Sequence, residues 1–300
     1  MLTNFFSKSK PVTSVAILLL FVCFFLAAFL NSTSLLKTAS YLPLFLLILG
    51  VFNFINSKNS LTFDNSFAFL FFTLLFGYFH QSFAINQHTY GHLTLLLFLR
   101  KVYSLQSDKN LTLKYFDGGL WLGISFLTVP TTVIFAPLLY VSILYHQRLT
   151  IQSFLSPIIG FFAPVFLYFT YCYWYELDNT FYSLFNWTTV TDYSLYQKLF
   201  FLIPFIAFST ITLIGIVLKT PKALAIKNSF RINWLLLLFN LAIAIILVLL
   251  IQQKDGSELI YLFFPTAIII ANLIEILQKK WLKEIILSLF IVGAFIMLFI

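Results

Sequence analysis

The sequence predicts an all-α integral membrane protein, a polytopic bundle of about eleven transmembrane helices. Its 300 residues are 61% hydrophobic and only 9% charged, whereas soluble domains contain about 25% charged residues. Apolar runs of about the 20 residues that a helix needs to cross a bilayer recur along the chain. The 18 Lys and Arg residues fall in short clusters between these runs, as membrane orientation signals do. We therefore expect a lipid bilayer as the main partner, and no nucleic acid.

The clearest predicted spans are continuous apolar runs, which favour helices over a β-barrel because barrel strands alternate apolar with polar residues. They cover residues 12–30, 41–55, 67–85, 154–175, 199–218, 233–251, 259–277 and 283–300. Lys8 and Lys10 precede the first run, but no small-residue cleavage pattern follows it. We therefore predict an uncleaved first span.

Residues 88–146 leave two topologies open. If they hold three short helices, the chain has eleven spans, and only Lys37, Lys198 and Lys254 lie outside the cytoplasm. If 93–105 does not cross the membrane and 115–146 is one broken helix around Pro130, the chain has nine spans, and four more Lys or Arg residues lie on the outer side. The positive-inside rule favours eleven spans, with the N-terminus cytoplasmic and the C-terminus on the outer side.

No internal repeat and no Pro- or Ser-rich linker divides the sequence, so residues 1–300 are predicted to form one transmembrane domain. The longest predicted outer loop is 176–198. Within it, apolar residues and a threonine recur at helical spacing, namely Phe181, Leu184, Phe185 and Thr188. This spacing predicts a short helix lying on the outer membrane surface.

A candidate site lies in the predicted outer cleft between residues 88–92 and the loop 176–198. Carboxylate and imidazole groups can take or give a proton, so the candidate catalytic residues are Asp178, Asp192 and His88. Polar and aromatic side chains suit a lipid-linked or sugar-bearing ligand, so the candidate ligand-binding residues are His92, Tyr90, Glu176, Trp174 and Trp187. The alternative is an aromatic belt with solvated acids.

Metal and cofactor signatures give no positive prediction. His88 and His92 are four residues apart and share a helix face, but no nearby Cys, Asp or Glu supplies a third metal ligand. We therefore predict no metal site, and the cofactor stays unknown. The segment 117–119, Asp-Gly-Gly, lacks the remainder of a phosphate-binding loop, and its small residues favour close helix contact instead. Glu275 is predicted to extend to the interface or to pair with Lys279, four residues on.

Several segments of the chain also resemble those of a known protein family. The helix ending in Arg100 and Lys101, the segment 116–123 (Phe-Asp-Gly-Gly-Leu-Trp-Leu-Gly), Arg148 and the segment 157–160 (Pro-Ile-Ile-Gly) together resemble the central region of GT-C-type glycosyltransferases. The whole chain also resembles an uncharacterised family of polytopic bacterial inner-membrane proteins. The resemblance implies a GT-C-like fold and a transferase of polyprenyl-linked sugars in envelope assembly. The sequence departs from that pattern because its first outer loop, 31–40, contains no carboxylate.

Whether the chain is an enzyme stays open at this stage. If it is one, the resemblance implies a polyprenyl-linked sugar transferase, with the glycan lipid as its substrate. The alternatives are a non-catalytic membrane scaffold or a subunit that binds other membrane subunits, and a transporter. A transporter needs ionisable residues at mid-depth in the membrane, and the predicted spans have almost none.

Overall fold

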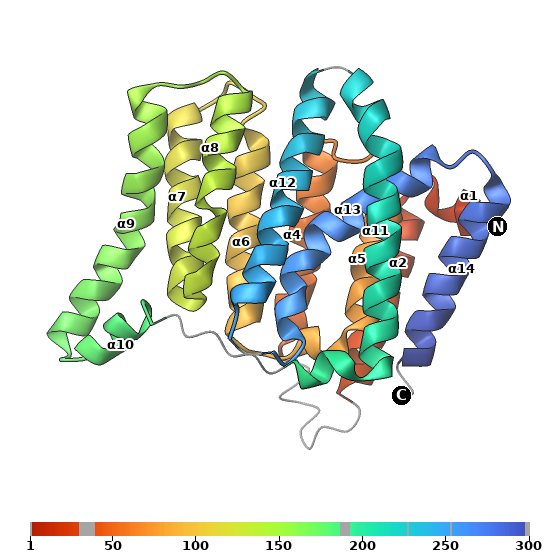
Figure 1. Ribbon diagram of the computed structural model, residues 1–300, viewed down its shortest axis with the longest axis horizontal. Coiled ribbons are helices and arrows are strands. Elements are labelled where there is room, and N and C mark those ends of the chain that lie inside the picture. The colour runs from red at the N-terminus through yellow and green to blue at the C-terminus, as the bar shows by residue number, and fades with distance from the viewer. Residues whose placement is uncertain (1, 30–39, 187–192, 227, 253, 298–300) are drawn as a thin grey trace. The chain divides into compact units, whose positions relative to one another are not determined.

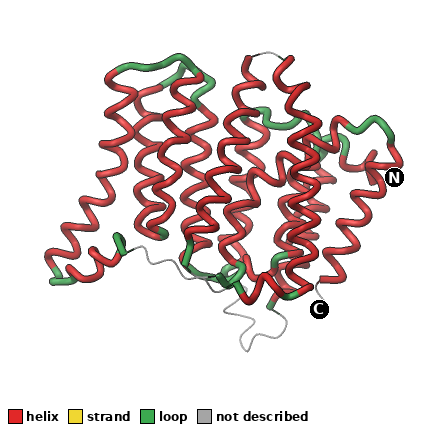
Figure 2. Tube along the Cα trace, viewed as in Figure 1, coloured by secondary structure: helices red, strands yellow, loops and turns green. Residues whose placement is uncertain are grey.

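The structure is a computed structural model, and it describes residues 2–29, 40–186, 193–226, 228–252 and 254–297 (Figure 1). Over these ranges the chain forms helices and loops without a strand, which confirms the predicted all-α class (Figure 2). Five helices are long and apolar enough to cross a membrane, and they cover Pro11–Ala28, Ile151–Trp174, Leu199–Ala225, Ser229–Leu250 and Ser257–Ile276. They support the prediction of a membrane protein.

The chain divides into two compact units. Unit 1 comprises Met1–Ile85, Asp192–Leu238 and Lys254–Ile300, and unit 2 comprises Asn86–Thr191 and Phe239–Gln253. The helix α12 (Asn228–Leu250) contributes to both. That residues 1–300 act as one transmembrane domain stays a prediction.

Unit 1 is built around α5 and α13. Besides part of α12, its helices are α1 (Leu2–Phe6), α2 (Pro11–Ala28), α4 (Leu42–Lys58), α5 (Phe67–Tyr78), η1 (His80–Phe83), η3 (Ser194–Gln197), α11 (Leu199–Ala225), η4 (Ser257–Leu259), α13 (Ile260–Ile276) and α14 (Lys280–Met297). α2, α4 and α14 contact α5, while α11 contacts α13. The two central helices are mainly apolar and buried along most of their length, as expected of helices enclosed by others.

Phenylalanine fills the core of unit 1. Phe52 of α4 stacks on Phe72 of α5 with ring centroids 3.9 Å apart, and Phe76 meets Phe263 of α13 edge to face at 5.0 Å. Aromatic pairs in these geometries add stability beyond the area they bury. The high phenylalanine content, 39 residues of 300, is therefore used in part for helix packing.

Unit 2 contains the region that left two topologies open. Residues 88–146 form α6 (Gln87–Ser104), α7 (Leu111–Thr128), the short helix η2 (Pro130–Phe135) and α8 (Ala136–Tyr145). α7 ends at Thr128 because Val129 is extended and Pro130 has no backbone N–H to continue the helix. The chain then reverses, so that α7 and α8 lie side by side rather than end to end (Figure 1). The region therefore forms separate helices, and how many of them cross the membrane stays a prediction.

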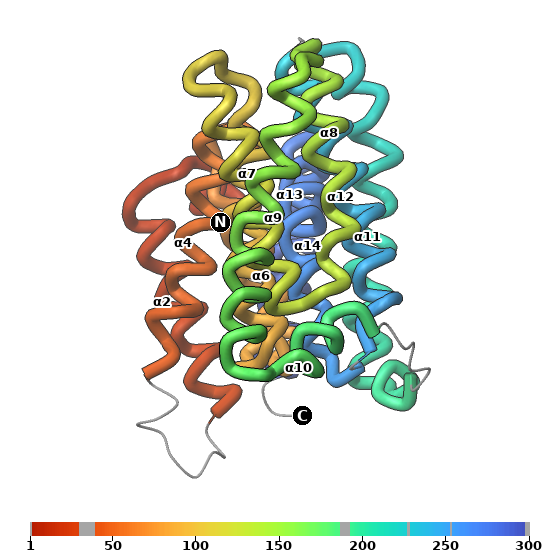
Figure 3. Tube along the Cα trace, turned by 90° about the vertical axis from the view of Figure 1, so that its left-hand side faces the viewer, coloured from red at the N-terminus to blue at the C-terminus, as the bar shows by residue number. Residues whose placement is uncertain are grey.

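Glycine brings α7 against α9 (Ile151–Trp174), and Figure 3 shows the two helices alongside each other. A Cβ on Gly119 would collide with the carbonyl of Pro157, and one on Gly123 would lie 2.5 Å from the carbonyl oxygen of Phe161. On the opposite side, a Cβ on Gly160 would collide with the Phe116 carbonyl. Gly119 of the segment 117–119 therefore lies at a close helix contact, and with Gly123 it forms the small-xxx-small pattern typical of membrane helices.

The predicted short helix of the outer loop is α10 (Asp178–Ser183). Phe181 and Leu184 pack on Phe126 of α7 and Val165 of α9, so the apolar side of this segment faces these two helices of unit 2. Thr188, which the sequence pattern includes, lies outside the described residues. The position of α10 at a membrane surface stays a prediction.

Charged residues at the other end of α6 and α7 pair within unit 2. The Lys101 ammonium lies 2.6 Å from the Asp117 carboxylate, and Arg148 pairs with Asp108. Lys114 donates to the carbonyl of Ser104 at 2.7 Å. The contacts of Lys101 and Lys114 join α6 to α7, and that of Arg148 holds the loop 105–110, on the side that the charge pattern predicts to be cytoplasmic.

Candidate functional site

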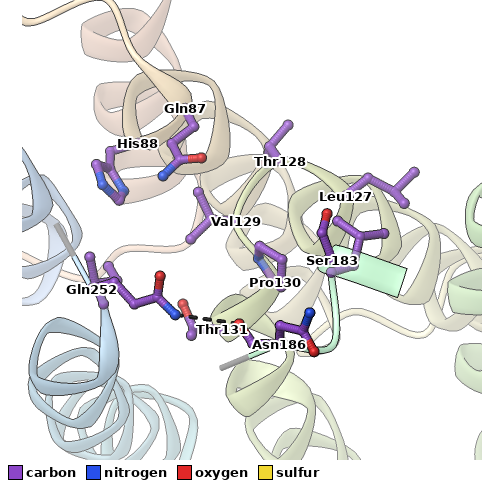
Figure 4. A pocket seen from close by; sticks show the side chains of 12 residues that line it. Gln87, His88, Leu127, Thr128, Val129, Pro130, Thr131, Ser183, Asn186 and Gln252 are labelled. Atoms are coloured by element: carbon purple, nitrogen blue, oxygen red, sulfur yellow. Dashed lines mark hydrogen bonds between the residues drawn. The ribbon is translucent and has the colours of Figure 1, made fainter. Parts of the chain in front are cut away.

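The clearest candidate site is a cavity of about 300 Å³ in unit 2 (Figure 4). Its walls come from the start of α6, the junction of α7 with η2, the end of α10 and the end of α12. The lining residues are Gln87, His88, Leu127, Thr128, Val129, Pro130, Thr131, Ser183, Leu184, Asn186, Ile251 and Gln252. The volume lies at the lower end of the range for small-molecule sites. All four walls belong to segments that the eleven-span topology predicts to be on the outer side.

Helix capping places His88 at this cavity. The Asn86 side-chain oxygen accepts hydrogen bonds from the backbone N–H groups of His88 at 3.0 Å and Thr89 at 3.3 Å, and so fixes the first turn of α6. The His88 side chain is 1% exposed and lines the cavity. Its imidazole is therefore held among neighbouring residues rather than solvated on the surface.

The junction after α7 supplies the opposite wall. Thr128 donates to the carbonyl of Ser125 at 2.8 Å, which closes the last turn of α7, and Pro130 starts η2. This abrupt reversal places Thr128 and Thr131 at the same opening (Figure 4). A hydroxyl from each side of the proline thus becomes available to one bound group.

A hydrogen bond joins the two remaining walls. The Gln252 side-chain amide donates to the carbonyl oxygen of Asn186 at 3.4 Å, linking the end of α12 to the segment after α10 (Figure 4). At this length the bond is weak, so a ligand that offers a better acceptor can replace it at small cost.

The cavity is polar without fixed charge. Its described lining includes amide, hydroxyl and imidazole side chains, but no Asp, Glu, Lys or Arg. Groups of this kind form directional hydrogen bonds to neutral hydroxyls and amides. They do not supply the cations that a phosphate group needs in a partly buried site.

The predicted site residues are only partly brought together. His88 lines the cavity, whereas His92 lies one turn further along α6, buried and outside the cavity lining. Tyr90 is exposed on the same helix. Neither histidine belongs to a larger ligand set, because the described part of the chain contains no group of three or more His, Cys, Asp or Glu that could hold a metal ion.

The predicted acids and aromatics of the outer loop lie elsewhere. Trp174, at the end of α9, is 79% exposed, Glu176 has a left-handed backbone with φ of 56°, and Asp178 begins α10. Glu176 and Asp178 are exposed, and none of the three lines the cavity. Asp192 and Trp187 lie outside the described residues.

Sequence reasoning missed Glu258, a fully buried carboxylate in unit 1. It accepts hydrogen bonds from the Tyr196 hydroxyl and from the backbone N–H of Gly256, the latter at 2.8 Å. Burial, and then the charge of Glu258, raise the pKa of the Tyr196 phenol. The available signal was the position of Glu258 directly before the apolar run 259–277, because an acid next to a helix that becomes buried can be buried with it.

Comparison with known proteins assigns the chain to a family but not to an activity. One family model matches residues 1–300, and it is described as "Family of unknown function (DUF6427)". No curated protein matches the chain, and no solved structure matches it. Function is therefore inferred from the residues of this chain.

Proposed function

The chain belongs to this family of unknown function, DUF6427, and we propose that it is a multi-pass inner-membrane protein that binds a neutral polar group in the unit 2 cavity without transforming it. In this role it is a non-catalytic subunit of a membrane assembly. The single observation that carries the proposal is the composition of the cavity wall, which offers hydrogen bonds but no carboxylate and no Lys or Arg.

The multi-pass part of the proposal has two supports. Five helices meet the length and composition of a membrane span, and three shorter apolar helices, Leu42–Lys58, Phe67–Tyr78 and Pro130–Tyr145, fall between them. With eleven spans, fifteen of the eighteen Lys and Arg residues fall in the segments on the cytoplasmic side, as the positive-inside rule requires. We propose eleven spans, a cytoplasmic N-terminus and a periplasmic C-terminus.

The ligand class follows from the hydrogen-bonding groups. Thr128, Thr131 and Ser183 offer hydroxyls, while Gln87 and Gln252 offer amides that can donate and accept. A hydroxylated or N-acylated neutral group, such as a sugar carried on a polyprenyl lipid, matches both kinds of partner. The apolar surface around the outer ends of the helices would hold the lipid part.

A polyprenyl-linked sugar transferase is the second candidate, and the position of His88 favours it. The imidazole could take the proton of an acceptor hydroxyl in the cavity. Sugar transfer from a polyprenyl diphosphate also needs positive charge to stabilise the leaving phosphate. No described lining residue provides it, so we rank binding above transfer.

The test uses the full chain in nanodiscs with N-acetylglucosamine linked to a polyprenyl diphosphate as the probe. We expect this probe to bind more tightly than polyprenyl diphosphate alone. Thr131→Val should reduce this difference in affinity, because the variant keeps the side-chain shape and loses the hydroxyl. Thr210→Val, which alters an exposed threonine of α11, is the matched control. Equal binding of both probes would contradict the proposal. Release of the labelled sugar that His88→Gln abolishes would establish the transferase instead.

A further inference from the structure

A second cavity, of about 310 Å³, lies within unit 1 and is separate from the site already described. Ten of its twelve lining residues are polar, namely five serines, three asparagines, one threonine and Asp64. They come from Ser9 before α2 and the first turn of α2, from the end of α4, and from the loop between α4 and α5. The eleven-span topology predicts this loop to be cytoplasmic.

The loop that forms one wall of the cavity is held in place by buried polar groups. The Glu275 carboxylate accepts hydrogen bonds from the backbone N–H of Phe63 at 2.9 Å and from the Asn65 amide at 2.6 Å. The Asn272 amide donates to the carbonyl of Leu61 at 3.0 Å. Because α13 supplies both Glu275 and Asn272, the wall is anchored to the centre of unit 1.

The charge of Glu275 is already neutralised within the wall. Its partner is Lys219, whose ammonium also lies 5.2 Å from the ring centroid of Phe63 and 5.0 Å from that of Phe230. These cation–π contacts and the ion pair occupy both charged groups. Asp64 is therefore the acid that remains to act on the contents of the cavity.

Several polar side chains of the lining have unused hydrogen-bonding capacity. Among the described residues, none makes a hydrogen bond or ion pair with the side chains of Asn53, Ser60 or Asp64. Together they offer one amide, one hydroxyl and one carboxylate around the same space. A bound group with several N–H or O–H donors would satisfy them.

The charges around the cavity have both signs. Asp64 lines it, while Lys8 and Lys10 flank the lining residue Ser9 in the chain and Lys58 follows Ser57. The three lysines are exposed and lie outside the lining. A purely cationic ligand would be repelled by the lysines, and a purely anionic ligand by Asp64, so a ligand carrying both charges fits best.

We propose that this cavity binds a zwitterionic phospho-amine group, with its ammonium at Asp64 and its phosphate attracted by the flanking lysines. A charge-assisted hydrogen bond from the ammonium to the carboxylate would supply the specificity. Asn53 and Ser60 would accept or donate the remaining hydrogen bonds. This chemistry is present in phosphatidylethanolamine headgroups and in free phosphoethanolamine.

The experiment measures binding to the purified full chain in detergent. One arm titrates free phosphoethanolamine by calorimetry, and the other uses native mass spectrometry to compare retention of phosphatidylethanolamine with that of phosphatidylglycerol. Asp64→Asn should weaken binding of the amine by about tenfold, as expected for the loss of one charge-assisted hydrogen bond. Asp108→Asn is the control, because that side chain is 88% exposed on another predicted cytoplasmic loop and loses the same charge.

The outcomes separate the sources of the ligand and can overturn the proposal. Binding of the lipid but not of free phosphoethanolamine assigns the cavity to a membrane headgroup, and the reverse assigns it to a soluble amine; both support the shared chemistry. Equal retention of phosphatidylglycerol, unchanged binding by Asp64→Asn, or no binding of either amine would overturn it. Because Asp64 is exposed, the variant should fold normally, and an unchanged unfolding temperature verifies this.

Discussion

The ammonium of Lys219 on α11 lies 3.4 Å from the carboxylate of Glu275 on α13, and the two side chains are only 3% and 8% exposed. The charge pattern predicts that Lys219 lies on the cytoplasmic side, and the sequence predicts that Glu275 extends to the interface or pairs with Lys279. The pairing with Lys279 is wrong, because α13 ends at Ile276 and Glu275 turns toward α11 instead. The pair joins two helices and fixes the loop at Phe63.

Replacing one partner of this pair should destabilise the protein strongly. Lys219→Met leaves the Glu275 carboxylate buried without a counter-charge, which typically costs roughly 3–5 kcal/mol. Denaturant unfolding of the purified protein in detergent measures the effect. The double variant Lys219→Met/Glu275→Leu should recover part of the loss, because it removes both charges together.

Lys222→Met is the control for that measurement, since Lys222 is exposed on the same helix. Its free energy of unfolding should stay within about 0.5 kcal/mol of the wild type. If Lys219→Met is as stable as Lys222→Met, the ion pair does not support the packing of α11 on α13.

The contact between α7 and α9 gives a second prediction. Gly119→Ala should destabilise unit 2 by about 1–3 kcal/mol, because its Cβ would meet the Pro157 backbone and push the helices apart. Gly50→Ala on α4 is the matched control, since a Cβ there meets nothing within 4 Å. Thermal unfolding of the two variants should show a lower midpoint for Gly119→Ala alone. A similar midpoint for both would show that the helices adjust without cost.

Helix positions and local breaks could be predicted from the sequence because they depend on neighbouring residues. Apolar runs define where helices lie, and Pro130 with the extended residue before it ends α7. The small residues at 117–119 correctly indicated a close helix contact. In each of these cases the determining residues lie within one or two helical turns of the feature.

Pairings across helices could not be predicted in the same way. Lys219 and Glu275 are 56 residues apart, and Tyr196 and Glu258 are 62 apart, so their contacts depend on how the helices pack. The candidate site was affected for the same reason. His88 lines the cavity, as its position at the start of α6 suggested. Whether the acids of the outer loop reach the cavity depends on the turn at Glu176 and on the start of α10, and Asp178 lies outside the lining.

Orientation in the membrane is tested by reporter fusions. A periplasmic reporter should be active after residues 85, 180 and 300, and a cytoplasmic reporter after residues 110 and 225. The reason is that segments rich in Lys and Arg, predicted to be cytoplasmic, alternate along the chain with segments that contain few of them. Alkaline phosphatase and a fluorescent protein serve as the two reporters. Phosphatase activity after residue 110, with the other fusions as expected, would favour nine spans.

The pH dependence of stability is the last prediction and concerns His146, between α8 and α9. Burial first, and then the positive charge of Arg148, lower the pKa of this imidazole below its ordinary value of 6.5. The unfolded chain therefore binds a proton at a higher pH than the folded chain does. The stability contributed by the neutral histidine is present above pH 6.5 and is lost as the pH falls through the lowered value. His146→Gln should remove this part of the acid sensitivity, so its unfolding temperature should fall less than that of the wild type between pH 7 and pH 5. Parallel curves for the two proteins would show that His146 titrates alike in the folded and unfolded states.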